Sequence, residues 1–333
     1  MKKIFCERQR FYVVILLVFS FLFSCTDDRK TIVCWGDSLT APHNSNVLIA
    51  TVKETFFGNS LSFPEHMQRD WADDYNIINA GVGGENTLTL MSRQGVFPMK
   101  LFQDVVFNRD KNGKPFAKFP LIVLRSSYNS ELVYPFRQYG YDEKSPAMIN
   151  PCSINGKDYE LSIIEDKKYY VLKPKDEDIY DSIIKTGSVI NTFASKHLRN
   201  CYAYIFFMGQ NGSFADVGEL IKQYKAMIDY CGSDRYIVIG FHKPNKSIST
   251  INRMKEMEDS LQMAFSNHYI NLRDYLVRNG LSDAGLTPTE EDKDSMSIGQ
   301  VPPQLMVDGV HFTNDGYKLI SNLVKVKFKE LRY

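Results

Sequence analysis

The sequence predicts an α/β fold, a three-layer α/β/α sandwich with a mainly parallel sheet, interrupted by a β-rich insertion. Strand-like segments alternate with amphipathic helical segments in residues 31–96 and again in 201–333. This alternation is typical of a parallel sheet covered by helices on both faces. Residues 97–200 differ, because they contain short β-like runs broken by turn residues. A chain of 333 residues is also longer than a domain built on a single hydrophobic core usually is, so an insertion or a second domain is expected.

The alternating parts give a definite order of elements. Before the insertion we expect strands at 31–35 and 75–81, a helix at 62–74 and a short helix from Thr87. After it we expect strands at 201–209, 235–242 and 269–276, with helices at 215–232 and 251–267. In the helix at 215–232, apolar residues recur at helical spacing on one face, namely Val217, Leu220, Ile221, Tyr224, Ile228 and Cys231.

The insertion is predicted from its β-like runs and its turns. The runs are PLIVLRSSYN (120–129), KDYELSIIED (157–166), KKYYVLKP (167–174) and GSVINTFAS (187–195). Asn-Gly pairs at 112–113 and 155–156 favour tight hairpin turns. A segment of this length is usually functional or domain-forming, so we expect it to wall a crevice and select the substrate without supplying catalytic groups.

The N-terminus has the layout of a secretion signal. The first ten residues carry four basic side chains, and the apolar run 11–24 that follows is shorter than the roughly 20 residues of a spanning helix. We therefore predict a signal peptide at 1–24. The run ends in Ser24-Cys25, which resembles a bacterial lipobox, so Cys25 is the expected lipidation site and 25–30 the tether. The expected location is the bacterial cell envelope, on a membrane through the lipid anchor, facing the periplasm or the cell surface. The alternative is a plain signal peptide or an uncleaved anchor in which Cys25 is incidental.

Composition excludes some classes of protein. Lys and Arg number 40 against 39 Asp and Glu, and this net charge of +1 gives no electrostatic footprint for nucleic acid. Hydrophobic content of 44% with 24% charged residues is ordinary for a globular protein.

Outside the leader the cysteines are Cys34, Cys152, Cys201 and Cys231, which lack CxxC spacing and predict neither a zinc site nor a disulfide framework. Cys34 and Cys231 lie on apolar faces and are expected in the core. No His, Cys or Asp cluster has metal-ligand spacing, and no cofactor is expected.

Polar residues follow several of the predicted strands. Ser38 comes just after the first strand, Gly84 after the second and Asn211 after the strand at 201–209, while Asp308 and His311 lie in the loop before the last helix. The loops after parallel strands gather along one edge of the sheet. These residues are therefore expected at one crevice.

Four sequence blocks around these residues share a family pattern. They are Gly36-Asp37-Ser38-Leu39, Asn79-Ala80-Gly81-Val82-Gly83-Gly84, Gly209-Gln210-Asn211 and Asp308-Gly309-Val310-His311. In this order the blocks resemble those of the SGNH hydrolases, also called GDSL esterases and lipases, across 31–96 and 201–333. The resemblance implies a flavodoxin-like sheet and a serine acyl hydrolase. The chain departs from the family at Gly212, where Asp is frequent, and at Phe312, where Pro is common.

The residue types fit that chemistry. A serine hydroxyl needs a base to take its proton, and imidazole suits that task near neutral pH, so Ser38 is the predicted nucleophile and His311 its base. Asp308 can accept a hydrogen bond from the other ring nitrogen and stabilise the imidazolium. The oxyanion hole is predicted to consist of the backbone N–H of Ser38, the backbone N–H of Gly84 and the side-chain amide of Asn211. Asp37 is expected to cap or brace the serine turn.

Other readings of the same residues remain open. Gly81 to Gly84 could open a dinucleotide loop, but the GxGxxG spacing is not met. His43 and His242 lie near strand ends, where they would line the pocket, although such histidines are more often on the surface or in loops. The remaining histidines are treated as structural, and they are His66, His197 and His268.

The predicted function is an envelope serine esterase that removes O-acyl groups, such as acetyl, from a carbohydrate through an acyl-enzyme. The partners expected are an acylated small molecule or glycan and the membrane, and no nucleic acid. Aromatic residues of the insertion would stack on sugars or form its core, and they are Tyr128, Tyr134, Phe136, Tyr139, Tyr141, Tyr159, Tyr169 and Tyr170. The alternatives are a lysophospholipase or thioesterase, which would need a long apolar groove, and a noncatalytic glycan-binding lipoprotein.

Overall fold

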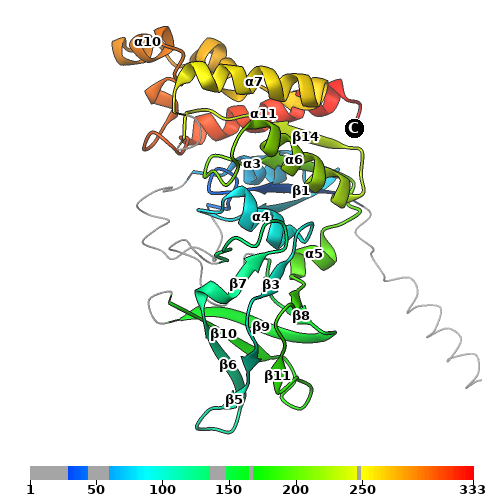
Figure 1. Cartoon of the computed structure of the whole chain (residues 1–333). Coiled ribbons are helices and arrows are strands. Elements are labelled where there is room, and N and C mark those ends of the chain that lie inside the picture. Colours follow the sequence, from blue (N-terminus) through cyan, green and yellow to red (C-terminus); the bar gives the residue numbers. More distant parts are fainter. Residues whose placement is uncertain (1–28, 44–59, 136–147, 165–167, 246–248) are drawn as a thin grey trace, which may run out of the picture.

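A five-stranded parallel sheet lies at the centre of the computed structural model, which describes residues 29–43, 60–135, 148–164, 168–245 and 249–333 (Figure 1). The strands are β1 (Lys30–Gly36), β2 (Tyr75–Gly81), β13 (Ala203–Phe207), β14 (Tyr236–Ile239) and β15 (Tyr269–Ile270). They lie in the order β15-β14-β13-β1-β2, and every neighbouring pair is parallel. Counted along the chain this is the order 2-1-3-4-5 of flavodoxin-like sheets, which confirms the predicted fold class.

Helices cover both faces of this sheet. One face packs against α3 (Phe63–Trp71) and α11 (Asn314–Glu330), and the other against α4 (Thr87–Gln94), α6 (Val217–Cys231) and α7 (Ile251–Phe265). Alternate residues of β1 enter the two cores. Ile32 and Cys34 join the core with α3 and α11, whereas Val33 and Trp35 join the core with the other helices. The period-2 alternation of a strand thus produces the three layers.

Between α4 and β13 the chain forms short strands, which make up the lower part of the molecule in Figure 1. They pair in the orders β5-β6-β10-β9-β8, β11-β4 and β12-β3-β7. Their bounds are β3 (Met99–Leu101), β4 (Val105–Val106), β5 (Asn108–Arg109), β6 (Pro115–Pro120), β7 (Leu124–Ser126), β8 (Cys152–Ile154), β9 (Lys157–Ile164), β10 (Tyr169–Pro174), β11 (Ile183–Ile184) and β12 (Val189–Ile190). Asn155 and Gly156, both with positive φ, form the tight turn between β8 and β9 that their sequence predicts.

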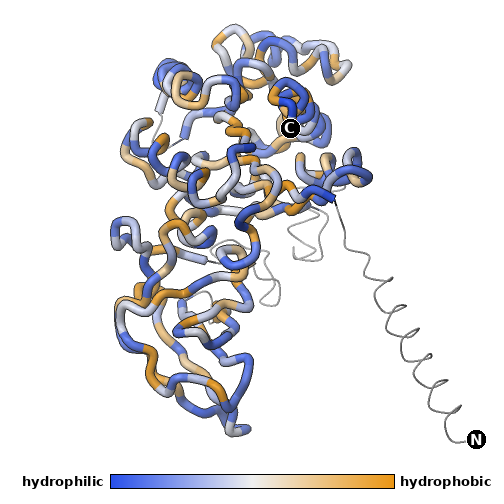
Figure 2. Tube along the Cα trace, turned by 90° about the vertical axis from the view of Figure 1, so that its right-hand side faces the viewer, coloured by the Kyte–Doolittle hydropathy of each residue, from blue (hydrophilic) through white to orange (hydrophobic). Residues whose placement is uncertain are grey.

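The strands of 97–200 share a hydrophobic core with the sheet and its helices. One cluster of buried side chains runs from Trp35 through Leu90 of α4 to Met99, Tyr159 and Tyr170. Apolar stretches accordingly occur along both parts of the chain in Figure 2. The segment is therefore packed against the sheet and helices rather than tethered to them.

The expected strand at 269–276 is wrong beyond its first two residues. After β15 the chain turns into α8 (Leu272–Tyr275), because the Asn271 side chain accepts a hydrogen bond from Asp274 N and so caps a helix. Two of the β-like runs in the insertion are also partly helical. Residues 121–123 form a 3₁₀ turn before β7, and α5 (Phe193–His197) follows β12 after the capping residue Thr192.

The remaining helical elements are short. They are a 3₁₀ turn at Ser266–His268, a π-helical turn at Leu276–Gly280, α9 (Leu281–Asp283), α10 (Glu290–Ser297) and a 3₁₀ turn at Pro303–Leu305. Over the described ranges, no helix has the length and apolar character needed to cross a membrane.

Candidate active site

The turn after β1 holds Ser38 tightly against the sheet. Thr40 N and Ala41 N donate to the Asp37 carbonyl at 3.0 and 2.9 Å, and Leu39 N donates to Asp37 Oδ1 at 3.0 Å. A Cβ on Gly36 would lie 2.1 Å from Thr40 Oγ1. The predicted brace at Asp37 is therefore present as a set of hydrogen bonds.

Ser38, His311 and Asp308 form one chain of contacts. Ser38 Oγ lies 2.9 Å from His311 Nε2, and His311 Nδ1 lies 2.8 Å from Asp308 Oδ2. Ser38 is buried, with 9% of its surface exposed, while the Asp308 carboxylate is one-third exposed. The structure thus brings together three residues that are separated by up to 273 positions in the chain.

The loop that carries Asp308 also sets its protonation state. Burial alone would raise the pKa of this carboxyl, but hydrogen bonds from His311 N, from the His311 ring and from Val310 N outweigh it and lower the pKa below the ordinary value. Asp308 Oδ1 accepts from Val310 N at 2.9 Å and from His311 N at 2.7 Å. An ionised Asp308 can hold the Nδ1–H of His311 and leave Nε2 to accept a proton.

Two of the three predicted oxyanion donors are the backbone N–H groups of Ser38, in the turn after β1, and of Gly84, in the loop after β2. Gly84 has a φ of 72°, a left-handed conformation that favours glycine. Among the residues that the structure describes, neither the backbone N–H of Ser38 nor that of Gly84 has a hydrogen-bond acceptor. Both donors are thus available to a bound oxygen, and their catalytic role stays a prediction.

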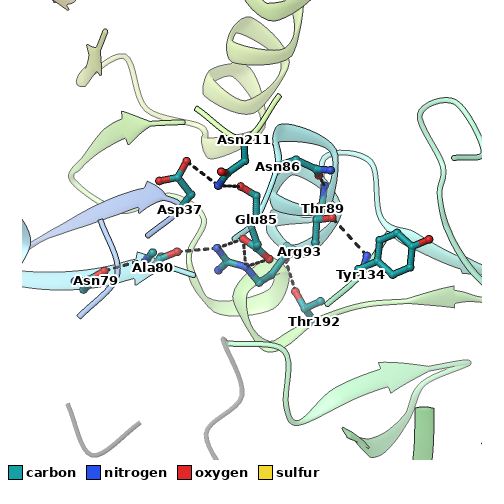
Figure 3. Close-up of polar contacts among 11 residues, drawn as sticks. Asp37, Asn79, Ala80, Glu85, Asn86, Thr89, Arg93, Tyr134, Thr192 and Asn211 are labelled. Atoms are coloured by element: carbon teal, nitrogen blue, oxygen red, sulfur yellow. Dashed lines mark hydrogen bonds and ion pairs between the residues drawn. The ribbon is translucent and has the colours of Figure 1, made fainter. Parts of the chain in front are cut away.

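The Asn211 amide is engaged within the protein (Figure 3). Its Nδ2 donates to the Glu85 carbonyl oxygen at 3.0 Å and lies 3.3 Å from Asp37 Oδ2. Asn211 therefore joins the serine turn to the loop of Gly84. To serve as an oxyanion donor its amide would have to exchange one of these acceptors for the substrate oxygen.

The other histidines lie outside this chain of contacts. His43 and His242 lie in loops, as expected, but they are buried and not on the surface. Burial lowers the pKa of each to about 3. His242 is among the residues that line a cavity beside Asp308. His66 is buried beside α11, His197 is exposed on α5, and His268 Nδ1 lies 2.9 Å from the Tyr236 carbonyl oxygen.

The cysteines include no disulfide among the described residues, and Cys34 and Cys231 are in the core as predicted. Across the same described ranges, no group of three or more His, Cys, Asp or Glu side chains could hold a metal ion.

A cavity of about 500 Å³ borders the site on the Asp308 side. It is lined by loop residues after β14, by α10 and by the loop before His311. Its polar lining includes Lys243, Glu291, Ser295 and Gln300, and its apolar lining includes Pro303 and Met306. The cavity can therefore hold a group that carries both hydroxyls and carbon faces.

No protein-family model and no curated protein sequence matches this chain. Among solved structures, it is similar to the psychrotrophic esterase EstA from Pseudoalteromonas sp., with 11% identity, a TM-score of 0.41 and coverage of 91% of this chain and 98% of that one. It is also similar to protein YxiM from Bacillus subtilis, with 12% identity, a TM-score of 0.40 and coverage of 91% of this chain and 57% of that one. Because both TM-scores are below 0.5, the functional assignment rests on the geometry of the site.

The site predicts a pH dependence of stability at Asp37. Burial, together with the charge of Glu85, raises the pKa of this carboxyl to about 7 despite the hydrogen bond from Leu39 N. An aspartate in an unfolded chain has a pKa of about 3.9. The folded protein thus binds this proton more tightly, and the contribution of Asp37 to the free energy of unfolding falls as the pH rises from about 4 to about 7.

Asp37→Asn should remove that dependence. We expect the Tm of the variant minus the Tm of the wild type to increase from pH 4 to pH 7, as measured by circular dichroism melting. Two Tm curves that stay parallel over this range would contradict the protonation of Asp37.

Proposed function

We propose that this chain is a serine ester hydrolase of the SGNH type. The single observation that carries the proposal is the run of contacts from Ser38 Oγ through His311 to Asp308 at the carboxyl edge of the parallel sheet. A hydroxyl on an imidazole whose other nitrogen faces a carboxylate is the arrangement used for acyl transfer.

The reaction would proceed in two halves. His311 Nε2 takes the proton of Ser38 as Oγ attacks the acyl carbon, and the same imidazole then gives that proton to the leaving alcohol. Water, activated by His311, hydrolyses the acyl-enzyme. The backbone N–H groups of Ser38 and Gly84, joined by the Asn211 amide, would stabilise the oxyanion of each tetrahedral intermediate.

An O-acylated carbohydrate is the substrate class that we favour. The support for it is the cavity that adjoins the triad at Asp308, whose polar side chains from Lys243, Glu291 and Gln300 suit an alcohol with several hydroxyls. Ser38 and His311 are not part of its lining, so the substrate would have to extend from the serine past Asp308 to reach it. A lysophospholipase or thioesterase would need a long apolar groove instead.

The aromatic side chains of segment 97–200 divide between two roles. Tyr159 and Tyr170 are buried and belong to the core, whereas Tyr128, Tyr134 and Tyr169 are partly exposed. Phe136, Tyr139 and Tyr141 lie outside the described residues. We propose that this segment selects the substrate. None of the proposed catalytic groups comes from it, so its contribution would be to substrate binding and not to the chemical step.

The hydrolase proposal is tested by the loss of turnover in Ser38→Ala and His311→Ala. Each should abolish hydrolysis of p-nitrophenyl acetate by a soluble fragment that starts after Cys25, with little change in Tm, because the nucleophile or its base is missing. A panel of short-chain, long-chain and sugar acetate esters would then rank substrates by kcat/KM.

Wild-type turnover in either folded variant would overturn the mechanism. The absence of turnover on every ester of the panel would favour the noncatalytic glycan-binding alternative. Faster turnover of long-chain esters than of sugar acetates would favour the lysophospholipase or thioesterase.

We also propose that the protein is a lipoprotein of the cell envelope, anchored through Cys25. The evidence is the order of basic residues, apolar run and Ser24-Cys25 in the sequence. The predicted signal peptide at 1–24 and residues 25–28 of the tether, which include Cys25, lie outside the described residues.

The anchor has a test of its own. Cys25→Ser should abolish incorporation of a metabolically supplied fatty-acid analogue and leave the chain as precursor or as released protein. Label that persists in the variant would show that Cys25 is not the acceptor.

A further inference from the structure

A buried ion pair joins Glu85, the residue after Gly84, to Arg93 on α4 (Figure 3). Arg93 on α4 donates from Nε to both carboxylate oxygens of Glu85 at 3.0 Å, and from Nη2 to Oε2 at 2.8 Å. The two side chains are only 1% and 2% exposed. No local sequence signal marks this pair, because Glu85 precedes the helix that carries Arg93 and the two residues do not have the i,i+3 or i,i+4 spacing of helical ion pairs.

The Arg93 side chain is fixed from two further directions. Its Nη2 donates to the Ala80 carbonyl at 2.7 Å, at the end of β2, and its guanidinium lies 5.0 Å from the centre of the Trp35 ring on β1. Thr192 Oγ1 of segment 97–200 donates to the Arg93 carbonyl. The cation is thus held against the ends of the two strands that lead to Ser38 and Gly84.

Glu85 transmits this anchoring to the proposed oxyanion donors. Its backbone follows Gly84 directly, its N–H donates to the Val82 carbonyl at 3.3 Å, and its own carbonyl accepts from Asn211 Nδ2 at 3.0 Å. Arg93 therefore fixes the side chain of Glu85, while the main chain of Glu85 lies between the Gly84 N–H and the Asn211 amide.

Stability alone is a poor reason for such a pair. Burying two charges costs several kcal/mol of desolvation per ion, and apolar side chains of similar volume often serve at least as well. An arginine–carboxylate pair, unlike apolar side chains, has hydrogen bonds with fixed directions. Such bonds are needed where a loop has to be held in one conformation.

We propose that Glu85 and Arg93 are positioning residues, which set the Gly84 N–H and the Asn211 amide for the oxyanion. This inference rests on the proposed ester hydrolysis. Neither side chain touches substrate in the proposed mechanism. Their effect should therefore appear in the chemical step and leave substrate binding nearly unchanged.

The chain offers a matched control in a second buried ion pair. Arg273 on α8 donates from Nε to Glu258 Oε1 on α7 at 2.6 Å, and these side chains are 3% and 2% exposed. None of the predicted catalytic or oxyanion residues lies on these two helices. Glu258→Gln thus removes the same charge from the same kind of contact at another place in the fold.

The experiment compares Glu85→Gln with Glu258→Gln on p-nitrophenyl acetate. We expect similar losses of Tm in both variants. In Glu85→Gln alone, kcat should fall about 10²-fold with KM within about twofold of the wild type, since misplacement of a catalytic group by 1 Å can cost that much.

A second pair of variants tests the arginine. Arg93→Lys should retain more kcat than Arg93→Met, because a lysine keeps a cation beside Glu85. Its kcat should still be below that of the wild type, because a lysine lacks the guanidinium fork that reaches both Glu85 and Ala80. If Glu85→Gln does not fold, this comparison decides the matter alone, and equal kcat in the two arginine variants would overturn the positioning role.

Two further outcomes would overturn it while the proposed function stands. One is wild-type kcat in folded Glu85→Gln, and the other is an equal loss of kcat in Glu85→Gln and Glu258→Gln. If the wild type hydrolyses no ester but all variants fold, the proposed function fails and this inference fails with it.

Discussion

The close packing of the serine turn against the ends of β1 and β2 is the constraint on which the site depends. Gly36 and Gly81 are partners in the register of these strands. A Cβ on Gly36 would lie 2.1 Å from Thr40 Oγ1, and a Cβ on Gly81 would lie 2.4 Å from Ala41 N. Such distances are far below any real contact, so a side chain at either position would push the turn away. Ser38 reaches His311 because both glycines let the turn fold back on the sheet.

The other half of the site depends on packing that is distant in sequence. His311 precedes Phe312 and Tyr317, which are fully buried in the core that contains α3 and α11. A bridge between Met306 and Phe312 closes the loop of Asp308, and Val307 N donates to the His311 carbonyl at 2.8 Å. The imidazole is therefore oriented by a closed loop on a packed helix. The same core positions the serine turn, because Leu39 is part of it.

The sequence is informative where one local signal decides the structure. The strand at 75–81 and the helix over most of 215–232 follow from β-type and helical periodicity, and the turn at Asn155-Gly156 follows from its residue types. The meeting of Ser38, Asp308 and His311 could be predicted because parallel strands end at one edge and because the four blocks resemble a family.

What the sequence did not predict depends on partners far along the chain. The burial of His43 and the pairing of Glu85 with Arg93 are defined by tertiary contacts alone. The helix after Ile270 is an exception, because it begins at a local signal, the Asn271 cap, which the β-like residues around it outweighed in the prediction of a strand. Asn211 lies beside the serine turn, as its position after a predicted strand suggests, but its contacts with Asp37 and the Glu85 carbonyl could not be read from its block.

Covalent labelling would show whether Ser38 is an activated nucleophile. A p-nitrophenyl alkylphosphonate carries a phosphorus that an activated serine attacks, with formation of a P–Oγ bond and release of p-nitrophenolate. After reaction, peptide mass spectrometry would locate the adduct. We expect one phosphonyl group per chain, on Ser38, with loss of hydrolysis in proportion to labelling and no labelling in a His311→Ala variant. An adduct on another residue, or full hydrolysis by protein labelled at Ser38, would contradict it.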